Sequence, residues 1–378
     1  MKERNNHMMK ELDYWLGIPF IYTLGFFHKK CPLPKLDEKL SAYHFVLIKT
    51  VAIGDTVLLS AVINELKNVY PNCHITIVCS GNNLAMVRLL TNVNEIFEFN
   101  MSRPLSSLWK LHTMKNIQIV FDFAPWARIN ALISWKIKAE FKIGFYRKNM
   151  YRHYIYDSAV EHRDDMHELD NYRSILQDMQ IPLQNYAPVI VVSDKDTLSQ
   201  MPKVSYVVFH LFPGGASAIL RSWEDDKWVQ LAKKIFEEYG YTIVLTGGTE
   251  DKEKAENIAD SLKKNNVPAY SLAGKVSLAE TVYVLKQAKL LVTVNTGIMH
   301  IGAAVGVPLI ALHGATSDKR WGPLSRSAVV IKSNEKCQPC ISLGFESKCQ
   351  NPICMHNINV DMVWKAVQEK LFHEGIAR

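Results

Sequence analysis

The sequence has 378 residues and a mass of 43.1 kDa, which exceeds one ordinary domain and suits two. Hydrophobic residues make up 48% and charged residues 21%, so the composition is globular and excludes a disordered chain. Lys and Arg number 44 against 37 Asp and Glu, giving a net charge of +7. This excess suits an anionic partner such as a phosphorylated substrate, an anionic membrane face or nucleic acid, although a merely soluble basic protein fits about equally well.

The N-terminal segment, residues 1–42, lacks the features of an export signal. Its apolar stretch 15–27 is interrupted by Gly and Pro, and no apolar run in the sequence reaches the ~20 residues that span a bilayer. The seven cysteines are an odd number, so at least one has no partner within the chain. We therefore expect a cytoplasmic protein with reduced thiols.

From Tyr43 onward, apolar strand-like runs alternate with helical patterns. In the first half the patterns predict strands at 44–50, 74–80, 95–99, 117–123 and 141–145, and helices at 55–70, 82–90, 105–115, 128–139 and 166–179. After a polar, Pro-bearing stretch that is typical of a linker, they predict strands at 205–211, 241–248, 290–294 and 308–314, and helices at 224–239, from 250, from 297 and at 360–372.

This alternation in both halves predicts two doubly wound α/β domains with parallel sheets. We place an N-terminal domain at 43–190, a C-terminal domain at 191–355 and a last helical segment at 356–378. Ligands of such sheets bind beyond the carboxyl ends of the strands, so the inter-domain cleft is the expected site.

The first strand-to-helix turn carries Gly54 and Asp55. Glycine permits a tight turn and a close approach of a ligand. The carboxylate of Asp55 has two interpretations: a helix cap, which is the commoner fate of such a residue, or a general base facing the cleft. The turn lacks the G-x-G-x-x-G pattern of dinucleotide-binding proteins.

The second domain begins with a strand followed by the small-residue turn of Gly214 and Gly215, which suits an anion or is a plain strand-end turn. Arg221 follows just before a helix, where its guanidinium can neutralise a diphosphate or simply face solvent.

Two further strand ends carry small and charged residues. Glu250 and Asp251 follow Gly247 and Gly248, and either acid can bind a ribose hydroxyl or complement a helix dipole. The next stretch repeats the pattern with Gly274 and Lys275.

The densest pattern follows the strand at 290–294. Asn295, Thr296 and Gly297 lead into a helix that carries His300 one turn later. The free N–H groups and positive dipole of a helix N-terminus suit phosphate, and for His300 a ligand role and a structural role are about equally supported.

These motifs, in this order over residues 44–330, resemble the ADP-heptose:lipopolysaccharide heptosyltransferases of glycosyltransferase family 9. The resemblance rests on IGDTVL, FPGGAS with RSW, TGGTEDKEKA, and LAGKVSLAE leading to NTGIMHIGAAVGVP. It implies a GT-B fold, in which two Rossmann-like domains face each other across a cleft, the N-terminal one binding the acceptor and the C-terminal one the nucleotide sugar. It also implies metal-independent transfer with inversion, without a catalytic cofactor.

By the same resemblance, Asp55 matches the catalytic base, Arg221 contacts the diphosphate, and Glu250 or Asp251 lies on the ribose side. The stretch Thr296, Gly297 and His300 matches the donor site of the family. Two departures stand out: Asn295 replaces an Asp, which questions the identity of the sugar, and Arg221 replaces a Lys.

The resulting hypothesis is transfer of a heptose, or a related sugar, from ADP-heptose to a lipopolysaccharide core-type acceptor at the inner face of the inner membrane. Three alternatives remain: a protein heptosyltransferase, a sugar-nucleotide epimerase and a non-catalytic nucleotide-sugar sensor. Nucleic acid is not an expected partner, since no recognition motif supports it.

Two segments lie outside these motifs. Cys337, Cys340, Cys349 and Cys354 suit a structural Zn or Fe ion, or are simply reduced thiols. Aromatic residues in 9–30 precede a basic flank, which is typical of a membrane-interface segment or of a helix packed on the domain.

Overall fold

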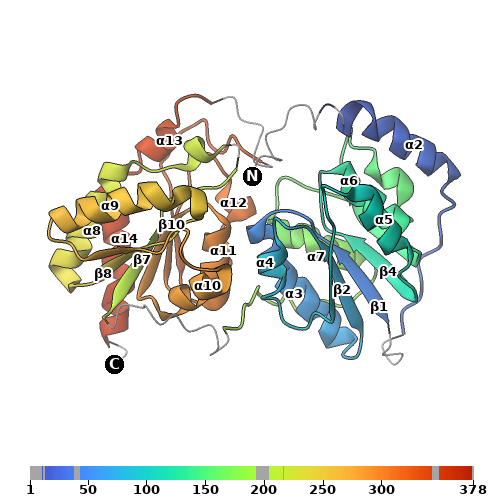
Figure 1. The fold of residues 1–378 in the computed structure, drawn as a ribbon, viewed down its shortest axis with the longest axis horizontal. Coiled ribbons are helices and arrows are strands. Elements are labelled where there is room, and N and C mark those ends of the chain that lie inside the picture. Colours follow the sequence, from blue (N-terminus) through green and yellow to red (C-terminus); the bar gives the residue numbers. More distant parts are fainter. Residues whose placement is uncertain are drawn as a thin grey trace. The chain divides into compact units, whose positions relative to one another are not determined.

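The computed structural model describes residues 11, 13–37, 43–192, 204–215, 217–342 and 349–376. The chain forms two compact units, Met1–Pro188 and Val189–Arg378, and each is described by itself (Figure 1). No helix within the described residues has the length and apolar character needed to cross a bilayer.

The first unit contains a six-stranded parallel sheet of order β3-β2-β1-β4-β5-β6 (Figure 1). Its strands are β1 (His44–Ile48), β2 (His74–Cys79), β3 (Glu95–Glu98), β4 (Ile117–Asp122), β5 (Ala139–Tyr146) and β6 (Ser158–Glu161). Its helices are α2 (Gly17–Phe27), α3 (Ile53–Val69), α4 (Leu84–Val87), α5 (Pro104–His112), α6 (Arg128–Lys136), the 3-10 turn η2 (Arg152–Ile155) and α7 (Glu168–Asp178). Helix α3 packs against α4 and α7, whereas α5 packs against α6, so helices cover both faces of the sheet.

The second unit repeats this plan with the order β12-β11-β10-β7-β8-β9. Its strands are β7 (Tyr206–His210), β8 (Thr242–Leu245), β9 (Ala269–Ser271), β10 (Leu290–Val294), β11 (Leu309–Leu312) and β12 (Ala328–Ile331). Its helices are η4 (Ala218–Arg221), α8 (Asp225–Tyr239), η5 (Thr249–Asp251), α9 (Lys252–Lys264), α10 (Leu278–Gln287), α11 (Gly297–Val305), α12 (Asp318–Trp321), α13 (Ile353–His356) and α14 (Val360–Ile376).

The strand order has a functional consequence. In each unit the first strand lies between the second and the fourth, so the chain reverses its winding between β1 and β4 and again between β7 and β10. The loops after these two strands leave in opposite directions and create a crevice at the carboxyl ends. We therefore look for ligand-binding residues after β1, β4, β7 and β10.

The cores explain why the apolar runs become strands. Strands β1, β4, β7 and β10 are flanked by other strands and buried on both faces, which requires nearly continuous apolar sequence. In the second unit the main apolar cluster joins the sheet to α8, α9 and α14, with Trp223 and Trp228 in edge-to-face contact at 5.0 Å. The last helix thus belongs to the core of the second unit.

Three strands were not predicted: β6, β9 and β12. All three lie at sheet edges. They have only three or four residues and partly exposed patterns, because one side of an edge strand has no neighbouring strand to bury it. The sequence pattern of apolar residues is therefore weakest in these strands, which is why it did not predict them.

Candidate functional site

The turn after β1 places Asp55 in the first turn of α3, with its side chain 19% exposed. The preceding Ala52 has a φ of +69°, which is unusual for a residue other than glycine. Thr56 supports this turn, because its hydroxyl donates to the Ala52 carbonyl over 2.7 Å. The constrained turn fixes Asp55 at the switch point between β1 and β4.

Asp55 has a partner that the sequence did not reveal. The ammonium of Lys49 lies 2.7 Å from its Oδ2 atom and also donates to the Phe123 carbonyl over 3.2 Å. Lys49 is 1% exposed and its ammonium lies 5.2 Å from the centre of the Tyr172 ring. A buried lysine directly after a strand of apolar residues was the available signal, since such a charge needs a partner.

The end of β4 carries a second buried ionic group. Asp122 accepts hydrogen bonds of 2.5 Å from both Arg152 and the Tyr156 hydroxyl, and its other oxygen accepts from the Ala124 amide over 2.9 Å. Arg152 also donates to the Ala124 carbonyl. Burial raises the pKa of Tyr156 well above its usual value, so its hydroxyl stays a donor. Arg152 is only 1% exposed, so its charge belongs to this buried group and not to the surface.

In the second unit Arg221 joins the two central strand ends. Its guanidinium donates to the Asn295 carbonyl over 2.9 Å, after β10, and to the Gly214 carbonyl, after β7. Gly215, the next residue, has a φ of +90°, which the absence of a Cβ permits. The structure thus brings together the Gly214 and Gly215 turn, Arg221 and Asn295 at the switch point between β7 and β10.

Asn295 itself is buried and held by its amide group. Its Nδ2 atom lies 3.3 Å from both the Trp321 carbonyl and Nε2 of His313. Burial lowers the pKa of His313 to about 4, so the ring is neutral at physiological pH. The Asn295 amide can donate a hydrogen bond to an acceptor nitrogen of the neutral ring, whereas an ionised Asp at this position could only accept one.

The start of α11 combines a cap with a buried imidazole. Thr296 is the N-cap, and its hydroxyl accepts from the Ile298 amide over 3.2 Å. Gly297 is the first residue of the helix and partly exposed, while His300 is 7% exposed. Gly302 approaches the sheet so closely that a Cβ would lie 2.5 Å from Leu291. The helix N-terminus is thereby held at the carboxyl end of β10.

The remaining predicted donor residues lie at the ends of β8 and β9. Asp251 accepts from the Gly248 amide over 2.8 Å, and burial raises its pKa. Glu250 is exposed. Gly274 has a φ of +66° and donates to the Gly247 carbonyl over 3.1 Å, so the two glycine-containing loops pack together. Lys275 is exposed and lies 3.1 Å from Glu256 of α9 in an ion pair.

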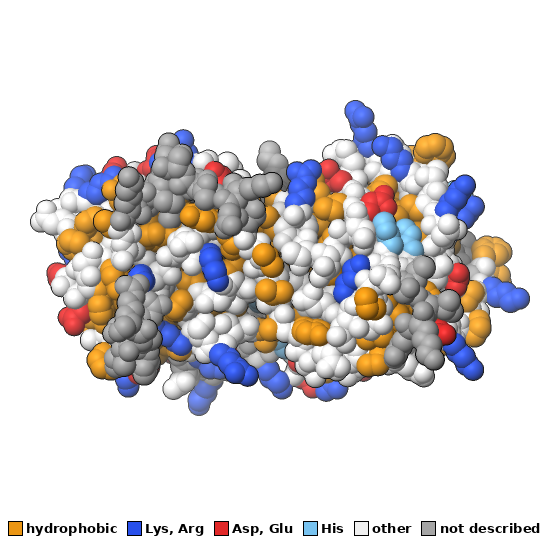
Figure 2. Space-filling model, turned by 90° about the horizontal axis from the view of Figure 1, so that it is seen from below, with side chains coloured by type: hydrophobic (Ala, Val, Ile, Leu, Met, Phe, Trp, Pro, Cys, Tyr) orange, Lys and Arg blue, Asp and Glu red, His pale blue; other side chains and the backbone are white. Residues whose placement is uncertain are grey.

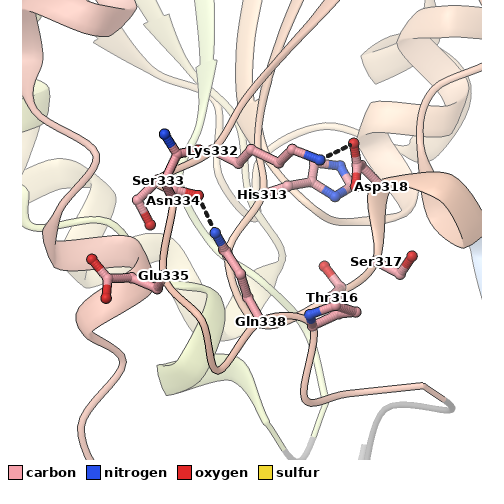
Figure 3. A pocket seen from close by; sticks show the side chains of 11 residues that line it. His313, Thr316, Ser317, Asp318, Lys332, Ser333, Asn334, Glu335 and Gln338 are labelled. Atoms are coloured by element: carbon pink, nitrogen blue, oxygen red, sulfur yellow. Dashed lines mark hydrogen bonds and ion pairs between the residues drawn. The ribbon is translucent and has the colours of Figure 1, made fainter.

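A pocket of about 290 Å³ opens beside this site (Figure 3). Its walls are the loops after β11 and β12, including His313, Ser317, Asp318, Lys332 and Gln338. Lys332 and Asp318 form a 2.7 Å ion pair across it. Since His313 also contacts Asn295, the pocket adjoins the end of β10. Sequence patterns did not indicate it, because its residues come from two separate loops.

The four cysteines of the C-terminal loop lie near one another. Burial raises the pKa of Cys354 to about 11, and the thiols of Cys340, Cys337 and Cys349 act in the same direction. Among the described residues, however, no three of these thiols lie within 4.8 Å of one another. The donor set suits a soft metal, but the thiols do not form a closed site in this arrangement.

The two parallel-sheet units have the fold of the GT-B glycosyltransferases. Residues 127–350 match the model of glycosyltransferase family 9, the heptosyltransferases. The match covers more than half of the sequence, and the chain belongs to this family.

Individual relatives agree with this assignment. Lipooligosaccharide heptosyltransferase 2 of Haemophilus influenzae is 24% identical over 298 residues, which cover 74% of this chain and 86% of that protein. A structure of E. coli ADP-heptose LPS heptosyltransferase II superposes with a TM-score of 0.71 at 20% identity, covering 88% of this chain and 99% of the other. A bacterial iron-containing dodecameric glycosyltransferase, TibC of enterotoxigenic E. coli, has a TM-score of 0.55 at 11% identity, over 89% of this chain and 77% of the other.

Proposed function

We propose that the protein is an inverting, metal-independent transferase that moves a heptose, or a related sugar, from ADP-heptose to a lipopolysaccharide core-type acceptor. The observation that carries this proposal is the partly exposed carboxylate of Asp55, fixed at the switch point of the first unit by Lys49 at 2.7 Å. Membership of the heptosyltransferase family supports the sugar class.

In this proposal the first unit binds the acceptor and the second the donor. Asp55 removes the proton from an acceptor hydroxyl while that oxygen attacks the anomeric carbon and the bond to the diphosphate breaks. Lys49 forms its ion pair with Oδ2 of Asp55, so Oδ1 is the oxygen that accepts the proton of the acceptor hydroxyl. One displacement of this kind inverts the anomeric centre.

The leaving diphosphate gains negative charge as the bond breaks. Arg221 supplies the cation, and the amides of the Gly214 and Gly215 turn and of the α11 N-terminus, at Thr296 and Gly297, supply donors. Arg221 is already oriented by two carbonyl groups, so little reorganisation is needed. Glu250 or Asp251 binds the ribose, Gly274 and Lys275 line the neighbouring loop, and Asn295 and His300 face the sugar side.

Nucleotide selectivity tests the donor part of this proposal. Thermal unfolding is measured with ADP, UDP, GDP, CMP and NAD at equal concentrations, because a ligand at 100 times its Kd stabilises the native state by about 2.7 kcal/mol. We expect ADP alone to raise the Tm. A shift with UDP or CMP instead would overturn the ADP assignment, and no shift with any of them would favour a protein without donor binding.

Product analysis then tests the reaction. Transfer from ADP-heptose to a lipid A–core acceptor distinguishes the proposal from its alternatives. Transfer to a peptide without lipid would identify a protein heptosyltransferase, and conversion of the donor without an acceptor would identify an epimerase. A donor that is bound but left intact would identify a sensor.

We further propose that α2 contacts the inner face of the inner membrane. Trp15, Phe26 and Phe27 are 71%, 82% and 77% exposed, and Lys29 and Lys30 follow them. The opposite side of the helix is fixed, since Ile21 is fully buried and Gly25 packs against Tyr154. Exposed aromatic rings beside lysines suit the interface of an anionic bilayer.

Sedimentation with vesicles tests this contact. The F26A/F27A variant is expected to lose most of its binding to phosphatidylglycerol vesicles, whereas W109A, which removes a 68% exposed ring from α5, should bind as the wild type does. Equal binding of all three proteins would contradict the proposal.

The cysteines form a separate, structural part of the proposal. Cys337, Cys340, Cys349 and Cys354 are proposed to hold a Zn or Fe ion after the thiols move closer together. Elemental analysis should find one equivalent of metal that the C337S/C340S variant lacks, and metal-free wild-type protein would contradict the idea.

A further inference from the structure

The opposite end of the first sheet carries a second cluster of chemically active side chains. In the parallel register His44 of β1 pairs with His74 of β2, and Thr76 of β2 pairs with Glu95 of β3. Residues 74 and 76 are two apart on one strand, so their side chains share a face. The sheet therefore places His44, His74, Thr76 and Glu95 side by side at the beginnings of three strands.

The side chains meet closely enough to share an ion. One ligand atom from each of His44, His74 and Glu95 lies within 4.8 Å of the others. Nε2 of His74 is 3.7 Å from Oε2 of Glu95, and the two imidazole rings are 4.5 Å apart at 75°. Zn–N bonds of about 2.0–2.1 Å place two tetrahedral ligand atoms about 3.3 Å apart, so small side-chain rotations suffice.

The contacts of the His44 ring favour its role as a metal ligand. Burial and the neighbouring His74 lower the pKa of His44, whereas its hydrogen bond to the backbone of Lys115 acts in the opposite direction. The Thr76 hydroxyl is 2.8 Å from Nε2 of His44 and donates to Oε2 of Glu95 over 3.3 Å. An ion bound by Nε2 of His44 would replace its contact with Thr76, while the hydrogen bonds from Thr76 to Glu95 and between His44 and Lys115 would orient the two ligands, as outer contacts do in known sites.

The cluster is open to solvent. The side chains of His74 and Glu95 are 45% and 55% exposed, which gives an ion a path to the site. Figure 2 shows the molecule from below, with histidine side chains lying together beside acidic ones. Strand β1 begins at this lower side in Figure 1.

We propose that His44, His74 and Glu95 form a binding site for a divalent transition-metal ion such as Zn²⁺, with water at the fourth position. Two imidazoles and one carboxylate are a donor set that such ions prefer. The ion would link β1, β2 and the edge strand β3. It would lie at the amino ends of these strands, away from Asp55 beyond the carboxyl end of β1, so its role is stabilising and not catalytic.

Differences between matched variants test this site independently of the cysteines. Untagged wild-type protein and the variants H74A, E95Q and H112A are titrated with Zn²⁺ by calorimetry and by thermal unfolding. His112 is an exposed histidine of α5 outside the cluster, and the cysteines are the same in all four proteins.

We expect H74A to bind one equivalent of Zn²⁺ less than the wild type, or to bind it at least about tenfold more weakly, with E95Q affected less. The Zn²⁺-dependent rise in Tm of the first unit should shrink in both variants and persist in H112A. Equal stoichiometry, affinity and Tm shift in wild type and H74A would overturn the proposal. An unchanged Tm of H74A without metal shows that the variant is folded.

Discussion

The two units share one topology, but the residues at the ends of their central strands differ in chemistry. In the first unit the ends of β1 and β4 carry charged pairs, Lys49 with Asp55 and Arg152 with Asp122. In the second unit the ends of β7 and β10 carry one guanidinium, Arg221, bound to backbone carbonyls, and the neutral pair of Asn295 and His313.

In the reaction proposed above, this difference corresponds to two roles, a base in the first unit and an anionic donor in the second. A base needs a carboxylate, and a carboxylate near the interior needs a cation beside it. An anionic donor brings its own charge, so a net positive and otherwise neutral pocket suits it better. The same strand order therefore supplies the location, and the residues at the strand ends decide the chemistry.

The largest expected effect is on kcat, when the charged site of the first unit is disrupted. Asp55→Asn should lower kcat for transfer by about 10²- to 10⁴-fold, because the amide accepts no proton. Donor binding, measured as the ADP-induced Tm shift, should remain. Asp165→Asn is the control, since Asp165 is an exposed, ion-paired Asp of the same unit. Near-normal turnover of D55N would refute the assignment of the base.

A smaller effect is expected in the second unit, where the charge can be kept while its geometry changes. Arg221→Met should reduce kcat/KM about 10²- to 10³-fold, since it removes the cation beside the diphosphate. Arg221→Lys keeps the charge but cannot hold both the Asn295 and Gly214 carbonyls, so we expect about a tenfold loss. Steady-state kinetics with ADP-heptose separate the two, and equal losses would show that the charge is unimportant.

Low pH should distinguish the two units, because the stability of the second unit depends on histidines that are neutral when buried. Burial lowers the pKa of both His210 and His313 to about 4, below the unfolded value of 6.5. The unfolded chain therefore binds more protons between these values, and stability falls as the pH drops from about 6.5 to about 4. Each histidine contributes a slope of about 1.4 kcal/mol per pH unit.

Trp223 and Trp228 are buried in this unit, so tryptophan fluorescence changes when it unfolds. In urea titrations at several pH values, His313→Asn should show a shallower dependence on pH than the wild type, and H112A the same dependence. An unchanged slope in His313→Asn would contradict a neutral His313 in the folded state.

The smallest effect concerns the two strand-end turns. The second unit has a glycine at positive φ, Gly215, where the first has Ala52. Ala52→Gly should stabilise the first unit by up to about 1 kcal/mol, since strain is relieved while the unfolded chain gains freedom. Gly215→Ala should destabilise the second by about 1 kcal/mol. Chemical denaturation measures both, and a destabilising Ala52→Gly would show that the turn is unstrained.

The strand ends were predictable because they are local features. Asp55 and Asn295 stand out as polar residues after apolar strands and Arg221 as a cation just before a helix, and the structure places all three at the two switch points. Their partners were not predictable in the same way. Lys49 is only six residues from Asp55, but its burial also depends on Phe123 and Tyr172, which are distant in the sequence.

Periodicity and motif order by themselves determined the α/β class, the two sheets, the positions of the central strands and the family. These features depend on the spacing of apolar residues along one segment. Only the tertiary structure decided the edge strands β6, β9 and β12, the burial of Arg152 and the meeting of His44, His74 and Glu95. Strand register and side-chain burial arise from contacts between distant segments, and these contacts are made only when the chain folds.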